Sequence, residues 1–392
     1  MREVLRNMPA ISGTINQSEQ YSDGGGEIVG LKNVNIRSLG IPRTLVLFNG
    51  KRIVFSSGTT NDGNAFVDVG NFPMIAMERI EVLKNGGAVS HGTDAMGGVF
   101  NFITRNKFEG FEMTGSHQDF DASDGIDEVS FIAGFGNGGA NIVFGAEWQN
   151  TNPMNVPERP YATFDGTWPL GVSSFGNPGT FQTSPAQNVV ADPACGMALP
   201  AQGVAGVAKA IGPVALNAVS RCGYNYVPFS NYIDPQERHK FFATFTMEIN
   251  DDVEIYAEAL HTQLRADYMG SPSYPPTNAG NYTSVPTASP GYQDWKLNTL
   301  PSLSADMQAA YNARESGAGT ITWFGRAVAI EGPSATFQNQ NDTSRWSVGA
   351  RGNLPGTDTG FDASVTYSTM NNKYSYYDIV SVSYTHLRAH ET

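Results

Sequence analysis

The sequence has no apolar run of about eighteen residues or more, so it predicts no membrane-spanning helix. The best candidate, residues 204–219, is interrupted by Lys209, Gly212 and Pro213, and we interpret it as a surface helix in a long connection. Basic residues are also few, with 24 Lys and Arg against 37 Asp and Glu and a formal net charge of −13. Because nucleic-acid phosphates require a basic face, this balance argues against nucleic acid as a partner.

Motifs of catalysis and nucleotide binding are missing as well. The glycine-rich stretch between residues 79 and 104 has no G-x-G-x-x-G and no P-loop spacing, and the chain contains no G-x-S-x-G elbow and no H-E-x-x-H. His386, His390 and Glu391 look like a metal cluster, but they lie in a segment, VSYTHLRAHET, that resembles translated sequencing-adapter DNA. We therefore predict no enzymatic activity, no cofactor and no metal site, and we expect residues 381–392 to be a non-native tail.

Cysteine is nearly absent too. Cys195 and Cys222 are the only two, and both fall in one predicted long loop among Pro, Gly and Asn. This pattern favours a loop-stapling disulfide formed in an oxidising compartment over a metal site.

Alternating apolar and polar residues are abundant from Phe111 onward. In residues 239–250, for example, Phe241, Phe245 and Ile249 share one face, and Thr244 and other polar residues share the opposite one. Segments of about ten residues with this alternation, separated by turns, are typical of strands in a transmembrane β-barrel. We predict about seven such strands, at residues 111–120, 128–137, 140–150, 239–250, 253–264, 345–354 and 360–370.

The predicted connections differ strongly in length. Those near Asn137, Asp251 and Gly356 are tight, whereas residues 151–238 and 267–343 form long links. The link near Asp121 is intermediate. Outer-membrane barrels have short periplasmic turns and longer extracellular loops, so the alternation favours a barrel over a soluble sandwich.

Residues before Phe111 have a different character, typical of a small mixed α/β unit. We expect a helix at 1–8, strands at 33–39 and 43–53, and a helical turn at 71–79. Two further strand patterns then flank a glycine-rich stretch, 84–98, where the backbone turns sharply or packs closely against another chain.

Two long motifs in this region resemble the plug domain of TonB-dependent outer-membrane receptors. They are VNIRSLGIPRTLVLFNGKRI from Val34 and ERIEVLKNGGAVSHGTDAMGGVFNFITR from Glu78, in the order that the family has them. The resemblance implies a mainly β fold, in which a small α/β plug domain is followed by the first antiparallel strands of an incomplete transmembrane β-barrel. We place the plug at 1–108 and the start of the barrel, with long extracellular loops, at 109–380. In the family, the plug fills a barrel of roughly 22 strands.

The resemblance also implies a function. Such a receptor captures a scarce solute, such as a ferric siderophore, a cobalamin or a carbohydrate, and imports it into the periplasm by energised plug movement. It implies the outer membrane of a Gram-negative cell as location, and outer-membrane lipid, the solute and TonB of the TonB–ExbB–ExbD complex as partners. The signal peptide and the TonB-contacting segment are not found in the chain, and we expect it to be a fragment.

Two arginines of the plug motifs, Arg37 and Arg79, match positions that carry Arg in the family, where such residues can pair with barrel carboxylates. The acceptors available on lumen-facing strand positions are Glu147, Glu248, Glu254 and Glu258. We hypothesise that these groups form a plug–barrel latch, because enclosed Arg–carboxylate pairs are strong but costly to desolvate. The alternative is that both arginines are solvated surface residues.

Two other classes of function remain open. A passive outer-membrane porin or adhesin barrel would lack the plug motifs. A soluble β-rich enzyme would need a catalytic cluster, and none is recognisable in the sequence.

Overall fold

The computed structural model describes most of the chain outside the longest connections. The described residues are 11, 14, 28–60, 62–85, 87–121, 123–155, 172–173, 179–184, 187–191, 210–211, 221–222, 224–225, 229, 231–270, 283–324, 335–354, 356–357 and 359–377. The predicted helix at 1–8 and the predicted tail at 381–392 lie outside them. The chain divides into two compact units, which are described separately: Met1–Met154 with Asn231–Tyr268 and Phe337–Ser375, and the remaining residues.

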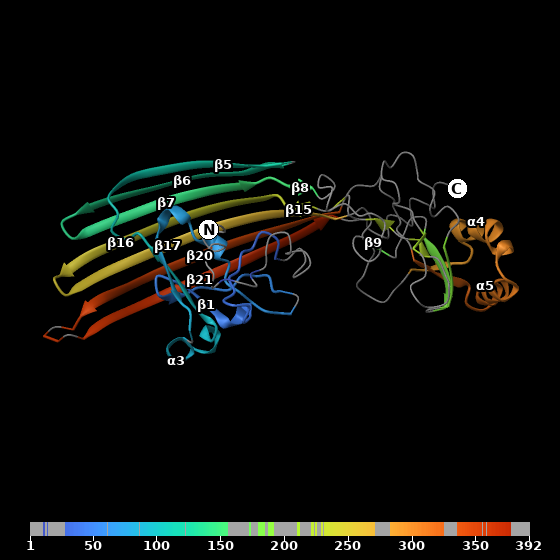
Figure 1. The fold of residues 1–392 in the computed structure, drawn as a ribbon, viewed down its shortest axis with the longest axis horizontal. Coiled ribbons are helices and arrows are strands. Elements are labelled where there is room, and N and C mark those ends of the chain that lie inside the picture. The colour runs from blue at the N-terminus through green and yellow to red at the C-terminus, as the bar shows by residue number, and fades with distance from the viewer. Residues whose placement is uncertain are drawn as a thin grey trace. The chain divides into compact units, whose positions relative to one another are not determined.

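The first unit contains a seven-stranded sheet of long strands in the order β21-β20-β17-β16-β7-β6-β5 (Figure 1). Each of the seven predicted strands is present, so this prediction is confirmed, and the strands run further than the sequence pattern indicated. The sheet is open, with β5 and β21 as its edges. Its strands are β5 (Gly110–Phe120), β6 (Ser123–Asn137), β7 (Ala140–Thr151), β16 (Gln236–Asn250), β17 (Val253–Gly270), β20 (Ala335–Asn353) and β21 (Gly360–Tyr377).

Connection lengths also follow the prediction, with one correction. β6 and β7 are joined through Gly138 and Gly139, both at positive φ, which suits glycine in a tight turn. β5 and β6 are joined just as tightly, with Phe120 paired to Ser123, so the expected intermediate link near Asp121 is wrong. The two longest links follow β7 and β17.

The two faces of this sheet differ in chemistry. Apolar side chains are on the exposed outer face and polar side chains are on the buried inner face, the reverse of the usual arrangement in a soluble protein. On β16, Phe241 is 54% exposed, whereas its neighbour Lys240 is 2% exposed and Thr244 is 3% exposed. Large apolar side chains stand exposed on the same outer face of the other strands, including Met113, Phe135, Ile142, Trp346, Val348, Val365 and Tyr367. The polar inner face is covered by the N-terminal small domain.

The small domain is built on a four-stranded sheet in the order β2-β1-β4-β3, in which β1 and β4 are parallel. The expected strand at 33–39 is wrong, because that segment is irregular apart from one bridge between Ile36 and Ile11. The expected helical turn at 71–79 is short and of 3₁₀ type. The elements are η3 (Ile41–Arg43), β1 (Thr44–Phe48), β2 (Lys51–Arg52), η4 (Val69–Asn71), η5 (Met74–Ala76), β3 (Met77–Leu83), α3 (Ala88–His91), η6 (Thr93–Ala95) and β4 (Gly98–Thr104).

One apolar core joins the small domain to the sheet. In the small domain, the ring centroid of Phe72 lies 5.1 Å from that of Phe48 and 4.7 Å from that of Phe102. Phe242 and Leu260, on inner-face positions of β16 and β17, belong to the same buried cluster. Because burial of apolar area drives association, this core fixes where the small domain sits on the sheet.

The described residues of the second unit form a four-stranded sheet, β11-β10-β19-β18, and the α-helices α4 and α5. Its core contains Trp295 and Tyr311, and the Tyr311 hydroxyl donates a hydrogen bond of 3.0 Å to the carbonyl of Phe181. The elements are β10 (Thr180–Ser184), β11 (Gln187–Ala191), β18 (Thr283–Pro286), α4 (Pro290–Asn298), η10 (Leu300–Ser302), α5 (Ala305–Ala318) and β19 (Thr320–Phe324).

Short strands complete the description. Ala210–Ile211 forms β12 and pairs with β13, so the helix expected at 204–219 is wrong at these residues. No helix in the described parts of the chain is long and apolar enough to cross a membrane. The remaining strands are β8 (Met154–Asn155), β9 (Val172–Ser173), β12 (Ala210–Ile211), β13 (Arg221–Cys222), β14 (Tyr224–Asn225) and β15 (Asn231–Ile233).

Candidate functional site between the small domain and the sheet

Arg238 of β16 is the most extensively bonded charge between the small domain and the sheet. Its guanidinium donates to a carboxylate oxygen of Asp68 at 2.7 Å, to the side-chain oxygen of Asn71 at 2.7 Å and to the carbonyl of Gly30 at 2.7 Å. Both members of the ion pair are almost fully buried, with side-chain exposures of 2% and 1%. A buried charge is tolerated only when it is paired and hydrogen-bonded, and Arg238 meets both conditions.

Local structure positions the acceptor. Asp68 is the N-cap of η4, and the backbone N–H groups of Gly70 and Lys32 donate to its Oδ1, each at 2.8 Å. A Cβ on Gly70 would lie 2.8 Å from Asp68 Oδ1 and 2.9 Å from Arg238 Cζ. Glycine is therefore required at this position for the guanidinium to approach the carboxylate.

A second buried pair joins Lys240 of β16 to Glu147 of β7. Glu147 also accepts a hydrogen bond of 2.7 Å from the backbone N–H of Met74, in the small domain. The ammonium of Lys240 donates to the carbonyl of Phe72 at 3.4 Å. The pair lies within the sheet, and main-chain groups of the small domain complete its hydrogen bonding.

A third pair joins Arg345 of β20 to Glu258 of β17, at 2.8 Å. Glu258 accepts a second hydrogen bond of 2.8 Å from the side-chain amide of Asn49, which has a positive φ in the turn after β1. The guanidinium of Arg345 lies 5.2 Å from the ring centroid of Phe48, a cation–π contact with the small domain.

More exposed pairs lie towards the short turns of the sheet. Lys107, in the segment that leads from β4 to β5, contacts Glu248 and Glu254, each at 3.0 Å. Lys51 of β2 lies 3.5 Å from Asp362 of β21. Exposed pairs of this kind contribute little to stability.

The hypothesised latch residues lie in different places. All four glutamates are on inner-face positions, but in the described structure neither Arg37 nor Arg79 contacts any of them. Arg37 donates to the side-chain oxygen of Asn85 at 3.1 Å and is exposed, and Arg79 pairs with Glu78 and Glu81 on its own strand. The alternation of β3 turns Arg79 towards solvent, so these two arginines are surface residues in this state.

The buried cations therefore come from the sheet, and the small domain supplies mostly carboxylate, carbonyl and amide groups. Sequence reasoning did not find Arg238, Lys240, Arg345 or Asp68. The available signal was the placement of Arg238 and Lys240 on alternate positions that a membrane strand turns inward, because a cation there needs a partner inside.

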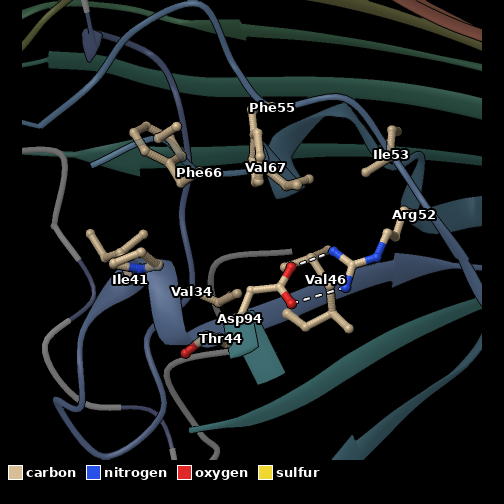
Figure 2. Close-up of a pocket in the computed structure, with 13 residues that line it drawn as sticks. Val34, Ile41, Thr44, Val46, Arg52, Ile53, Phe55, Phe66, Val67 and Asp94 are labelled. Carbon is tan, nitrogen blue, oxygen red and sulfur yellow. Dashed lines mark hydrogen bonds and ion pairs between the residues drawn. The ribbon is translucent and has the colours of Figure 1, made fainter. Parts of the chain in front are cut away.

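A cavity of about 350 Å³ lies within the small domain, beside β1 (Figure 2). Arg52 and Asp94 form a two-pronged ion pair at its side, and Figure 2 shows the carboxylate facing the guanidinium. The hydrogen bond from Arg52 holds the pKa of Asp94 below its ordinary value. Such a cavity suits an apolar group. Its lining is Val34, Ile41, Pro42, Thr44, Leu45, Val46, Arg52, Ile53, Phe55, Ala65, Phe66, Val67 and Asp94.

The predicted disulfide is not settled by this structure. Cys222 ends β13, but Cys195 lies outside the described residues. The Cys195–Cys222 bond stays a prediction.

Comparisons with known proteins bear on the small domain above all. Residues 1–99 match the family model described as TonB-dependent Receptor Plug Domain. The iron-regulated outer membrane virulence protein of Vibrio cholerae serotype O1 is 33% identical over 122 residues, which cover 26% of this chain and 18% of that protein. The match thus spans less than a fifth of the length of this curated relative.

Solved structures similar to the chain share little sequence with it. A mutant of the ferric enterobactin receptor from Pseudomonas aeruginosa is 13% identical, with a TM-score of 0.48 over 94% of this chain and 38% of that one. The siderophore receptor PirA from Acinetobacter baumannii is 12% identical, with a TM-score of 0.44 over 94% and 41% of the two chains. From the match over residues 1–99 and the order of its motifs, the small domain is a plug domain of the TonB-dependent receptor family.

Proposed function

We propose that this protein is a TonB-dependent outer-membrane receptor, which binds a scarce solute and imports it into the periplasm by energised movement of the plug. The observation that carries the proposal is the distribution of side chains on the two faces of the seven-stranded sheet. Its outer face exposes large apolar side chains, whereas its inner face holds ion pairs beneath the plug. A soluble protein rarely exposes apolar surface of this kind, but a strand in a bilayer requires it.

The extent of the apolar face agrees with a membrane. On β16, outward apolar residues run from Phe241 to Ile249. That stretch measures about 26 Å along the strand, or about 20 Å along the bilayer normal for a strand tilted by about 40°. We propose that residues 1–108 form the plug and residues 109–380 the lipid-contacting part, with the long connections outside the cell.

The buried pairs suggest how the plug is held and released. In the described structure, the buried Arg238–Asp68 ion pair crosses between sheet and plug, and the pairs at Glu147 and Glu258 are hydrogen-bonded to plug groups. Buried ion pairs give little net stability but are costly to break singly. This suits a plug that stays closed until TonB, the family's partner in the inner membrane, pulls on it.

For the solute we propose a ferric siderophore. Support comes from the name of the Vibrio cholerae relative, which is iron-regulated. A cobalamin or a carbohydrate is the alternative within the same family. Catalysis forms no part of the proposal, because the family consists of receptors.

Uptake of radiolabelled ferric siderophore tests this function. Cells grown without iron are compared with cells in which the gene is deleted, with and without a protonophore that removes the energy supply of TonB. We expect deletion and protonophore each to abolish uptake. Uptake that survives the protonophore would instead indicate a passive porin, and recovery of the protein outside the membrane fraction would indicate the soluble alternative.

A further inference from the structure

Three aromatic rings lie in a row on the inner face of the sheet, at the end where β17 and β21 finish and β20 begins. Tyr268 of β17 and Phe337 of β20 have ring centroids 5.3 Å apart, and Phe337 and Tyr374 of β21 have centroids 6.2 Å apart. The ring planes differ by 34° and 27°. Tyr374 is 43% exposed, so the row is accessible at that end.

A cluster of side-chain amides lies beside the row, on β20 and β21. The amide nitrogen of Asn372 donates to the side-chain oxygens of Asn339 at 2.6 Å and Asn341 at 3.0 Å, and Asn341 donates to Asn339 at 3.1 Å. Ser57 of the plug donates to Asn341 at 2.6 Å. Asn339 and Asn341 are buried, at 2% and 3% exposure, whereas Asn372 is exposed. Amides both donate and accept, so Asn372 can exchange these bonds for bonds to a solute while the two buried amides hold it in place.

Among the described residues, the inner face offers no buried positive charge without a carboxylate partner. Its three buried cations, Arg238, Lys240 and Arg345, are each matched by a carboxylate. The chain as a whole carries a formal net charge of −13. An anionic solute here would give up its hydration without gaining a cation, which is unfavourable.

We infer that the aromatic and amide strip, defined by Tyr268, Phe337, Tyr374, Asn339, Asn341 and Asn372, contacts a solute that carries no net charge and many oxygen acceptors. The inference rests on the proposed uptake function and deepens it. Among ferric siderophores it selects neutral complexes, in which three hydroxamates balance the metal charge, over trianionic complexes of three catecholates. The exposed aromatic face of Tyr374 contacts the apolar part of such a complex, and the amide of Asn372 donates to its carbonyl oxygens.

Binding of the two chelate classes tests the inference. Outer-membrane vesicles from cells that produce the protein are titrated with a ferric tris-hydroxamate and with a ferric tris-catecholate, and vesicles from deleted cells provide the background. We expect the neutral chelate to bind at least tenfold more tightly. Equal or tighter binding of the trianionic chelate would overturn the inference, and if its uptake needs energy the proposed receptor function would stand. Binding of neither chelate would overturn both the inference and the assignment of a ferric siderophore as the solute, and would leave a cobalamin or a carbohydrate as the cargo of the receptor.

Adjacent residues on β21 provide matched variants. Asn372→Ala and Tyr374→Ala remove groups of the strip, whereas Asn371→Ala and Tyr367→Ala change the same residue types on the outer face of the strand. We expect the inner-face variants to weaken binding of the neutral chelate about tenfold or more, at unchanged protein level in the vesicles. The outer-face variants should change it less than twofold. Equal effects on both faces would contradict the assignment of the strip.

Discussion

At the residue scale, Arg238 shows how a charge becomes part of a packed interface. Three acceptors from the plug surround its guanidinium. One of them, Asp68, is held in place by two backbone N–H groups that also belong to the plug. The pair is buried on both sides, so its contribution depends on both partners being present.

Removing one partner of this pair should destabilise the closed plug strongly. Asp68→Asn or Arg238→Met alone leaves an unmatched buried group, and we expect each to cost about 3–5 kcal/mol. The double variant Asp68→Asn with Arg238→Met should recover part of this, because neither charge is then left unmatched and the amide oxygen introduced at position 68 can still accept from the backbone N–H groups of Gly70 and Lys32. The unfolding free energies of the parent, the two single variants and the double variant are measured by limited proteolysis of the plug and by unfolding in detergent. If the loss in the double variant equals the sum of the two single losses, the two side chains are not directly coupled.

Gly70 permits the same contact and can be tested separately. Gly70→Ala places a methyl group 2.8 Å from Asp68 Oδ1 and 2.9 Å from Arg238 Cζ, and we expect a loss of about 1–3 kcal/mol in unfolding free energy. Gly115→Ala is the matched control, because nothing lies within 4 Å of its added carbon. A loss at Gly115 as large as that at Gly70 would show that the effect is not steric.

Asp234, just before β16, should make stability depend on pH. Burial raises the pKa of this carboxyl from 3.8 to about 7, and the side-chain amide of Asn231 donates a hydrogen bond of 3.1 Å to it. Because the folded form keeps the proton more tightly than the unfolded chain, unfolding free energy should fall as pH rises from about 4 to about 7, by at most about 4 kcal/mol. Thermal unfolding of Asp234→Asn should show a weaker dependence, whereas Asp251→Asn, in an exposed turn, should match the parent.

At the element scale, each long strand alternates between side chains suited to two different environments. The outer positions of β16 are apolar from Phe241 to Ile249, and the inner positions carry Arg238, Lys240 and Thr244. A strand of this kind is stable only between two different environments, hydrocarbon on one side and a polar protein surface on the other.

A charge on the outer face should therefore be costly in a bilayer. Phe245→Arg near the middle of the apolar stretch of β16 should reduce unfolding free energy in lipid vesicles by about 2–4 kcal/mol. Phe245→Leu keeps the apolar contact and should cost much less. If the arginine variant is as stable in vesicles as the leucine variant, this face does not contact hydrocarbon.

Strand prediction succeeded for the sheet and failed in part for the plug. The alternation in residues 239–250 is long and regular enough to identify β16 without any tertiary information. The segment 33–39 has similar apolar residues but forms no strand. Val34 and Ile36 are buried by packing in the core, and the segment is paired through an isolated bridge from Ile36 to Ile11 and not through a ladder. Short apolar patterns do not distinguish these two situations.

At the scale of the whole first unit, the plug and the sheet share one apolar core surrounded by ion pairs. Movement of the plug must separate Phe72 from Phe242 and break the bonds of Arg238 at the same time. The proposed transport cycle therefore needs an external force and should fail when the plug is tied to the sheet.

A reversible tether tests that requirement. Lys51 and Asp362 are partly exposed and their charged atoms lie 3.5 Å apart, so Lys51→Cys with Asp362→Cys can be joined by a short reducible thiol cross-linker. We expect cross-linking to lower solute uptake at least tenfold and reduction to restore it. The two single-cysteine variants, treated in the same way, should transport normally, and full uptake by the tethered protein would show that this contact persists during transport.

The sequence by itself determined the class of the fold, because alternation along a strand and the plug motifs are local properties of the chain. It identified the seven strands, the tight turns at Gly138 and Asp251, and the plug domain. Only the tertiary structure decided which charges meet. Arg37 and Arg79 are exposed and contact residues of the plug itself. Arg238 instead pairs with Asp68, far from it in sequence, because strand register and the packing of the apolar core bring the two together.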